Sequence, residues 1–156
     1  MAISPNNLFT SGQILTAAEC NQFPFGIVAL ASLNTATTVT TTEAVQITST
    51  TFTALANRYY KITYIENTLS FGASLPGFVT QRIRITGLAG TIYQSAFIEP
   101  VLASGDGQNA TISVVTTLPA GSTVIVGTSQ TSSNTATLYG ATGFTRQIVV
   151  EDMGPA

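Results

Sequence analysis

Residues 58–65 read Arg-Tyr-Tyr-Lys-Ile-Thr-Tyr-Ile, and their alternation decides the fold class. In an extended chain successive side chains point to opposite faces, so Tyr60, Ile62 and Tyr64 share one face and Lys61 lies on the other. This pattern is typical of a strand that is buried on one side only. The stretch therefore predicts a half-buried strand in an antiparallel sheet.

Residues 78–86, Phe-Val-Thr-Gln-Arg-Ile-Arg-Ile-Thr, repeat this alternation, with Val79, Ile83 and Ile85 facing inward. Turn residues separate further strand patterns, which we expect at residues 26–32, 37–41, 44–53, 91–98, 110–117, 122–128, 135–139 and 146–152. Residues 67–77 are rich in Ser and Gly and are expected to form a loop. Roughly nine or ten strands would curl or split a single sheet. We therefore expect an all-β fold, an antiparallel β-sandwich or jelly roll.

The composition agrees with a β protein and bears on the partners it can have. Threonine supplies about one residue in six, beside many Val, Ile, Tyr and Phe residues. Charged residues make up 8% of the chain, and the net charge of -2 gives no basic footprint for direct nucleic-acid binding. A surface this poor in charge indicates a protein that works inside an assembly.

The inventory of reactive side chains argues against an enzyme. The chain has no His, and Lys61 is its only Lys, so the usual routes to an activated Ser or Thr nucleophile are closed. The single cysteine, Cys20, can close no intrachain disulfide and build no thiolate metal site. We expect no catalytic residue, no cofactor and no bound metal.

The sequence shows no export signal and no membrane segment. The N-terminus lacks a basic region, and the longest apolar run, residues 24–33, is too short to span a bilayer. We expect a protein that is made in a cytoplasm and does not contact a membrane.

Residues 1–25 differ from the remainder, which is expected to form one β-sandwich domain over residues 26–156. Thr16 and Glu19 have the spacing of a capping box, which predicts one or two helical turns that end before Pro24. The apolar residues of this extended N-terminal arm are too dispersed to form a core of their own. The arm packs either on its own domain or on a neighbouring molecule, and the candidate contact residues are Leu8, Phe9, Ile14, Leu15, Phe23 and Phe25.

Arg82 and Arg84 are the sharpest polar feature of the chain. They are two residues apart on one strand, so both guanidinium groups leave the same face. They form either a solvated strand face or a pair of donors across a partner interface.

Two roles are open for four tyrosines on the expected strands. They form either a stacking surface for sugars or, as strand tyrosines more commonly do, part of a core or a subunit contact: Tyr59, Tyr60, Tyr64 and Tyr93.

Four stretches resemble small structural proteins of tailed bacteriophages. Residues 12–21, Gly-Gln-Ile-Leu-Thr-Ala-Ala-Glu-Cys-Asn, followed by the Phe-Pro-Phe-Gly of residues 23–26, resemble the opening of those proteins. Residues 147–156, Gln-Ile-Val-Val-Glu-Asp-Met-Gly-Pro-Ala, resemble their ending. Residues 57–63 and 81–85 are similar to two of their strands.

The resemblance implies a non-enzymatic virion component with a β-sandwich body. We prefer a capsid cement or decoration protein on the capsid exterior, whose partners would be the major capsid protein and further copies of itself in a homotrimer. Many copies would stabilise the assembled lattice by mass action. The alternative is a minor tail or fibre protein that adsorbs to the host, with glycan binding as one route.

Overall fold

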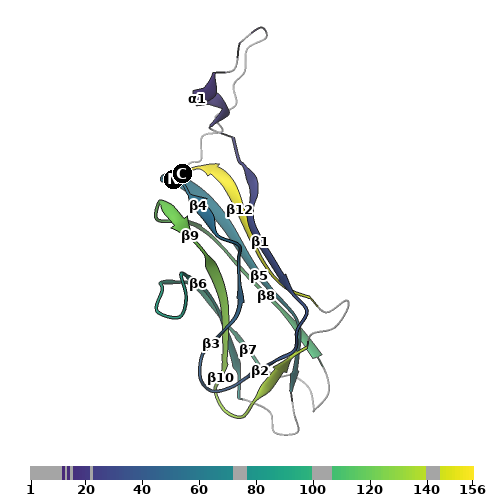
Figure 1. Cartoon of the computed structure of the whole chain (residues 1–156). Coiled ribbons are helices and arrows are strands. Elements are labelled where there is room, and N and C mark those ends of the chain that lie inside the picture. The colour runs from purple at the N-terminus through teal and green to yellow at the C-terminus, as the bar shows by residue number, and fades with distance from the viewer. Residues whose placement is uncertain are drawn as a thin grey trace.

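The computed structural model describes residues 12, 14, 16–21, 23–71, 77–99, 107–139 and 145–156. Two sheets pack face to face, and a single helical turn, α1 (Ala17–Cys20), stands above one end of them (Figure 1). The α1 turn is closed by the bond from the Cys20 amide to the Thr16 carbonyl, at 3.0 Å. The expectation of an all-β protein with antiparallel sheets is confirmed.

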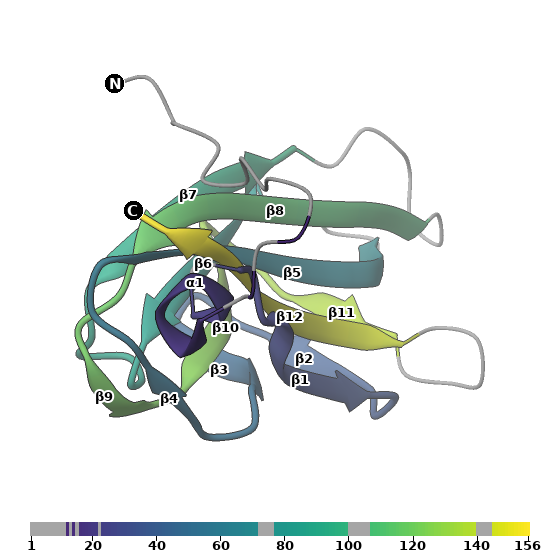
Figure 2. The same cartoon turned by 90° about the horizontal axis from the view of Figure 1, so that it is seen from above.

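Both sheets are assembled from strands that lie far apart in the sequence (Figure 2). The six-stranded sheet contains, in chain order, β1 (Gly26–Leu33), β2 (Thr37–Val39), β5 (Arg58–Phe71), β8 (Gly107–Thr117), β11 (Ala136–Leu138) and β12 (Arg146–Pro155). The four-stranded sheet contains β3 (Ala44–Thr48), β6 (Val79–Ile85), β7 (Ile92–Ile98) and β10 (Ile125–Thr131). A short pair, β4 (Phe52–Ala54) with β9 (Gly121–Thr123), extends one end of the sandwich.

The pairing of the main strands follows one rule. β1 pairs with β12, β3 with β10, β5 with β8, and β6 with β7, all antiparallel. In sequence order, the first of these strands therefore pairs with the last, the second with the second to last, and so on. This is the pairing of one long hairpin. The couples alternate between the sheets, which gives the orders β1-β12-β5-β8 and β3-β10-β6-β7.

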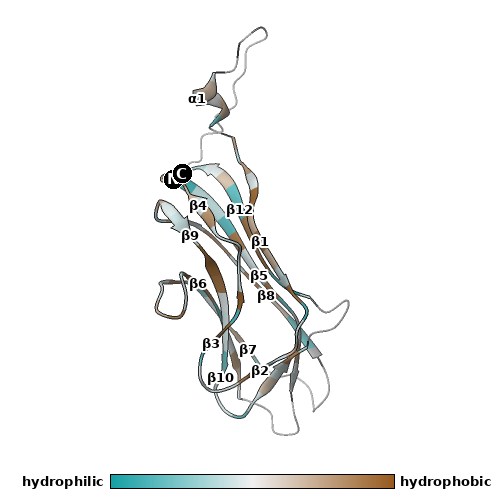
Figure 3. Cartoon of the chain, viewed as in Figure 1, coloured by the Kyte–Doolittle hydropathy of each residue, from teal (hydrophilic) through white to brown (hydrophobic). Residues whose placement is uncertain are grey.

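The core lies between the two sheets, where the inward-facing residues meet. Tyr60, Ile62 and Tyr64 are fully buried there, so the half-buried strand predicted at residues 58–65 is confirmed. Figure 3 shows apolar residues in the strands of both sheets. Gly127 lies against the Tyr64 ring, because a Cβ at this position would come within 2.7 Å of the ring atoms. The absence of a side chain on β10 makes room for the tyrosine.

Several expected boundaries were wrong. β8 and β12 each extend three residues beyond the expected strands, and β2 ends two residues earlier than expected. The loop expected at residues 67–77 begins later, since β5 continues to Phe71 and Leu69 is fully buried opposite β8 and β11. The strand expected at residues 44–53 is divided into β3 and β4, because the Ser49 hydroxyl, in place of a backbone carbonyl, accepts the hydrogen bond of the Ile125 amide. The strand expected at residues 122–128 is likewise divided into β9 and β10.

Candidate functional site

The base of the N-terminal arm is fixed to the sandwich by Arg58, the first residue of β5. Its side chain is buried and binds Asp152 of β12 through two hydrogen bonds, Nε to Oδ2 at 2.6 Å and Nη2 to Oδ1 at 2.5 Å. Such a bidentate pair holds the guanidinium plane in one orientation. Arg58 and Asp152 lie on the inward faces of their strands, in line with Tyr60 and Val150 respectively. We call this cluster the arm anchor.

The remaining donors of Arg58 hold the arm itself. Nη1 donates to the Asn21 carbonyl and Nη2 to the Phe23 carbonyl, both at 2.6 Å. The Phe25 ring lies over the guanidinium at 4.2 Å, within cation–π distance. The Phe25 amide also donates to Asp152 Oδ1, at 3.3 Å. One arginine therefore joins β5, β12 and the last residues of the arm.

The electrostatics of the arm anchor favour the charged pair. Burial alone would raise the pKa of Asp152, but the hydrogen bonds from Arg58 and from the Gly154 and Phe25 amides lower it below its usual value. The hydrogen bond with Asp152 raises the pKa of Arg58 in turn. Both shifts favour the ionised forms of the pair.

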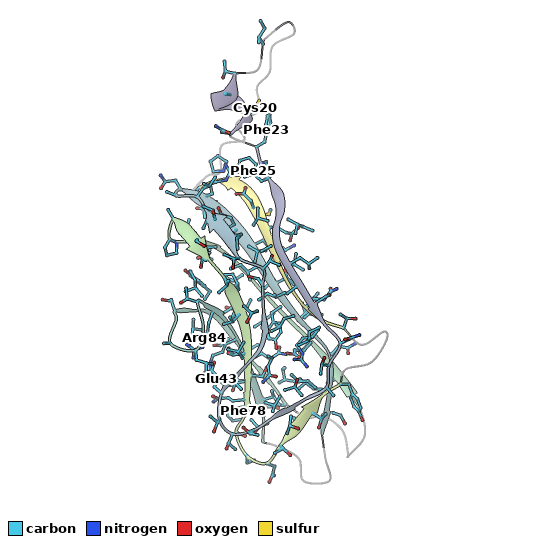
Figure 4. All side chains as sticks on the ribbon, viewed as in Figure 1. Cys20, Phe23, Phe25, Glu43, Phe78 and Arg84 are labelled. Atoms are coloured by element: carbon cyan, nitrogen blue, oxygen red, sulfur yellow. The ribbon has the colours of Figure 1, made fainter. Side chains whose placement is uncertain are left out.

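Beyond the anchor the arm leaves the body (Figure 4). Ile14 is 87% exposed, Phe25 is exposed on the outer side of the anchor, and Phe23 is half-buried. Cys20 is exposed on α1. Of the other predicted arm contacts, Leu8, Phe9 and Leu15 lie outside the described residues. The described arm thus has a fixed base and an exposed apolar outer part.

Arg82 and Arg84 are joined to Glu43, an arrangement that the sequence did not suggest. Arg84 binds Glu43 through Nε to Oε1 and Nη2 to Oε2, both at 2.8 Å, and Arg82 Nη1 lies 3.0 Å from Oε2. The Thr128 hydroxyl donates to Oε1 at 2.5 Å. Burial would raise the pKa of Glu43, but these hydrogen bonds and the two arginine charges lower it to about 2. The arginine pair is half-buried and neutralised in part, rather than a solvated strand face.

A second buried ion pair lies at the opposite end of β5 and β12. Arg146 and Glu66 are almost completely buried, with Nε and Oε2 3.4 Å apart. Arg146 donates from Nη1 to the Gln46 carbonyl at 2.7 Å and from Nη2 to the Thr35 carbonyl at 3.1 Å. Glu66 Oε1 has no hydrogen-bond partner among the described residues. Burial raises the pKa of Glu66 to about 8, although the Arg146 charge acts in the other direction.

All five basic side chains of the chain lie within 3.4 Å of a carboxyl oxygen of the same chain. Besides the four arginines, Lys61 lies 3.1 Å from Glu151 on the outer side of the six-stranded sheet. Among the described residues, no cluster of three or more His, Cys, Asp or Glu side chains could hold a metal ion. No helix in the same residues is long and apolar enough to cross a membrane.

The stacking surface considered for the tyrosines does not form. Tyr60 and Tyr64 are core residues, with the Tyr60 hydroxyl accepting from the Leu55 amide at 2.8 Å. Tyr64 Oη lies 3.5 Å from Ser129 Oγ inside the sandwich. Tyr59 and Tyr93 are half-buried and lie on different sheets, Tyr59 on β5 and Tyr93 on β7. The four rings therefore do not lie together on one exposed face.

No family model and no curated protein matches the chain. Among similar solved structures is the "Structure of Eiger TNF from S. frugiperda", with a TM-score of 0.53 and 6% identity over 84% of this chain and 95% of that one. A chain of "infectious bursal disease virus Gt strain" has a TM-score of 0.43 and 12% identity, and the alignment covers 81% of this chain and 38% of that one. A "Pentameric Capsid Protein Isolated from Metagenomic Phage Sequences" has a TM-score of 0.33 and 14% identity, over 94% of this chain and 82% of that one. The first likeness shows the fold alone, and the other two overlap too loosely to support an argument.

Proposed function

We propose that the chain is a non-enzymatic structural protein of a tailed-phage virion, a cement or decoration protein that binds the assembled lattice of the major capsid protein. Its place would be the exterior of the capsid, with synthesis in the host cytoplasm. The arm would clamp a neighbouring subunit, and the sandwich would supply the body.

The observation that carries this proposal is the arm anchor. Arg58 binds two arm carbonyls and the Phe25 ring, so the base of the arm is held in one direction. Ile14, farther out, is exposed to solvent. A segment that is already positioned loses less conformational entropy when it binds, and an exposed isoleucine adds apolar area to the contact. The geometry suits a clamp better than a lid on the protein's own body.

The position of the anchor also supports the resemblance to tailed-phage structural proteins. Its residues come from three separate stretches that carry that resemblance: residues 12–26, 57–63 and 147–156. These stretches are distant in sequence and meet at one end of the sandwich. If these stretches have the same structural role here as in the tailed-phage proteins, they would be expected to lie together in the fold, as they do.

The fold proposed for the body is a jelly roll. The pairing of β1 with β12, β3 with β10, β5 with β8, and β6 with β7 supports it, because a jelly roll is a long antiparallel hairpin rolled into two sheets. We propose that copies also associate with each other, in a trimer if the resemblance extends to the number of subunits.

The mechanism would be stabilisation by mass action. A protein that binds the assembled lattice more tightly than free capsid subunits shifts the equilibrium toward the assembled shell. Each contact can be weak, because many copies bound to one shell act together.

The test is co-sedimentation of the full chain with phage heads stripped of accessory proteins and, separately, with isolated tails. We expect saturable binding to heads, and about tenfold weaker binding for Ile14→Asp, since burial of one isoleucine contributes on the order of 1.5 kcal/mol or more. Leu88→Asp is the matched control, because Leu88 is an exposed apolar residue on a body turn. Binding to tails alone would contradict the capsid role and favour host adsorption.

A further inference from the structure

We propose that two copies of the chain associate face to face through the outer side of the β1-β12-β5-β8 layer, related by a twofold axis that runs along the seam between β5 and β12. This inference goes beyond the proposed function, because a contact on a twofold axis relates two copies and is distinct from the contacts within a trimer. It can fail while lattice binding stands, because its test needs no capsid.

The outer face is defined by the registers of the four strands. Three rows cross the layer, and each takes one residue from β1, β12, β5 and β8 in turn: Ile27, Glu151, Lys61 and Val115; Leu30, Val149, Thr63 and Ser113; Ser32, Gln147, Ile65 and Thr111. All twelve side chains are exposed or half-buried. Ile27 is 62% exposed and Val115 59%, so large apolar side chains are open to solvent on the two outer strands of this layer, β1 and β8.

The charge on this face is balanced and lies on its two inner strands, β5 and β12. Lys61 and Glu151 are the only charged residues among the twelve, and they are 3.1 Å apart. A twofold axis along the seam places β5 of one copy over β12 of the other. Lys61 of each copy then lies over Glu151 of the other copy, so the four charges alternate in sign.

The outer face of the four-stranded sheet would not allow the same packing. It carries Arg82 and Arg84 against the single carboxylate of Glu43, which leaves one net positive charge. Two such faces in contact would bring like charges together in a partly desolvated interface, which is unfavourable. Of the two sheet faces, only the outer side of the β1-β12-β5-β8 layer is complementary to itself.

The size of the face predicts a weak complex. Four strands about 4.8 Å apart and seven residues at about 3.3 Å each cover roughly 440 Å², or about 900 Å² for two copies. This is just below the roughly 1,000 Å² expected of a specific interface. Association would therefore be concentration-dependent, and it would become substantial where copies are held close together on a shell.

The experiment uses charge reversal in the full chain, with sedimentation equilibrium from about 1 µM to 1 mM. Lys61→Glu brings four carboxylates together across the seam of the dimer, and Glu151→Lys brings four ammonium groups together there. We expect each variant alone to associate at least about tenfold more weakly than the parent chain. An equimolar mixture of the two should regain association, because each face then meets its opposite.

The controls separate this contact from other effects. Phe97→Asp changes an exposed residue on the edge strand β7 of the other sheet and should leave the dimer unchanged. Circular dichroism shows whether each variant keeps its sheet content. A parent chain that stays monomeric at 1 mM, a trimer insensitive to both reversals, or a mixture that stays monomeric would overturn the proposal.

Discussion

Glu66 makes the stability of the folded chain depend on pH, because its carboxyl is buried beside Arg146 and one of its oxygens has no hydrogen-bond partner among the described residues. Its pKa of about 8 in the folded chain compares with 4.5 in water. Between these two values the folded chain keeps a proton that the unfolded chain releases, so the free energy of unfolding falls as the pH rises. The slope is about 1.4 kcal/mol per pH unit, and the total loss is on the order of 4 kcal/mol between pH 4.5 and 8.

The substitution Glu66→Gln keeps the shape of the protonated carboxyl and cannot ionise. We expect it to remove the slope and to make the variant more stable than the parent at pH 8. The assay is urea unfolding at half-unit steps from pH 5 to 8, followed by circular dichroism. This window is favourable because the chain has no His, and the lowered pKa values of Glu43 and Asp152 place their titration at lower pH.

The matched control is Glu99→Gln, which changes an exposed carboxylate at the end of β7 and should leave the slope intact. A parent chain whose stability is flat or rising from pH 5 to 8, together with a Glu66→Gln variant that is less stable at every pH, would refute the reasoning. That outcome would mean that Glu66 is ionised and that its ion pair with Arg146 outweighs the cost of burial.

Three further changes test other parts of the structure. Arg58→Lys keeps the charge beside Asp152 but cannot hold both arm carbonyls as well, so limited proteolysis should cut residues 12–25 faster while the body stays folded. Glu43→Gln leaves two half-buried arginines without their carboxylate and should lower the free energy of unfolding at pH 7 by about 2 kcal/mol in urea titrations. In the parent chain the contribution of Glu43 is present above pH 4.5 and is lost as the pH falls toward 2. Gly127→Ala forces a methyl group against the Tyr64 ring and should cost about 1–3 kcal/mol, measured as a lower melting temperature.

The fold class could be predicted from sequence because alternation is a local property. Tyr60, Ile62 and Tyr64 face the core as their spacing requires, and the long strand patterns mark real strands. The end of β5 was missed because polar residues such as Ser70 suggested a loop, whereas Leu69 and its neighbours pair with β8 and β11. That pairing joins segments about forty to seventy residues apart, which no local pattern records.

The candidate site was predicted only in part. The arm and its apolar residues could be identified from composition, but its anchor could not, since Arg58 and Asp152 are 94 residues apart. The sequence does contain one signal of buried charged pairs. Arg58, Glu66, Arg146 and Asp152 share the sequence parity of the inward-facing residues of their strands, and a charged residue on a core face requires a buried partner.

The arginine pair shows the limit of reasoning from a single strand. Arg82 and Arg84 leave the same face as expected, but the segment before β3 brings Glu43 over them. The sequence predicted either a solvated strand face or a pair of free donors. Neither prediction included a carboxylate from another segment of the same chain. The environment of the two arginines is therefore set by a tertiary contact that their own strand does not reveal.

The measurement that tests the central claim most directly compares assembled phage shells with unassembled major capsid protein as binding partners for the full chain. The account predicts saturable binding to the shells, at a stoichiometry set by the lattice, and at least about tenfold weaker binding to the free subunits. It also predicts that Ile14→Asp loses most of the shell binding while Leu88→Asp keeps it. Equal affinity for shells and free subunits, or no binding to either, would contradict a role in stabilising the capsid.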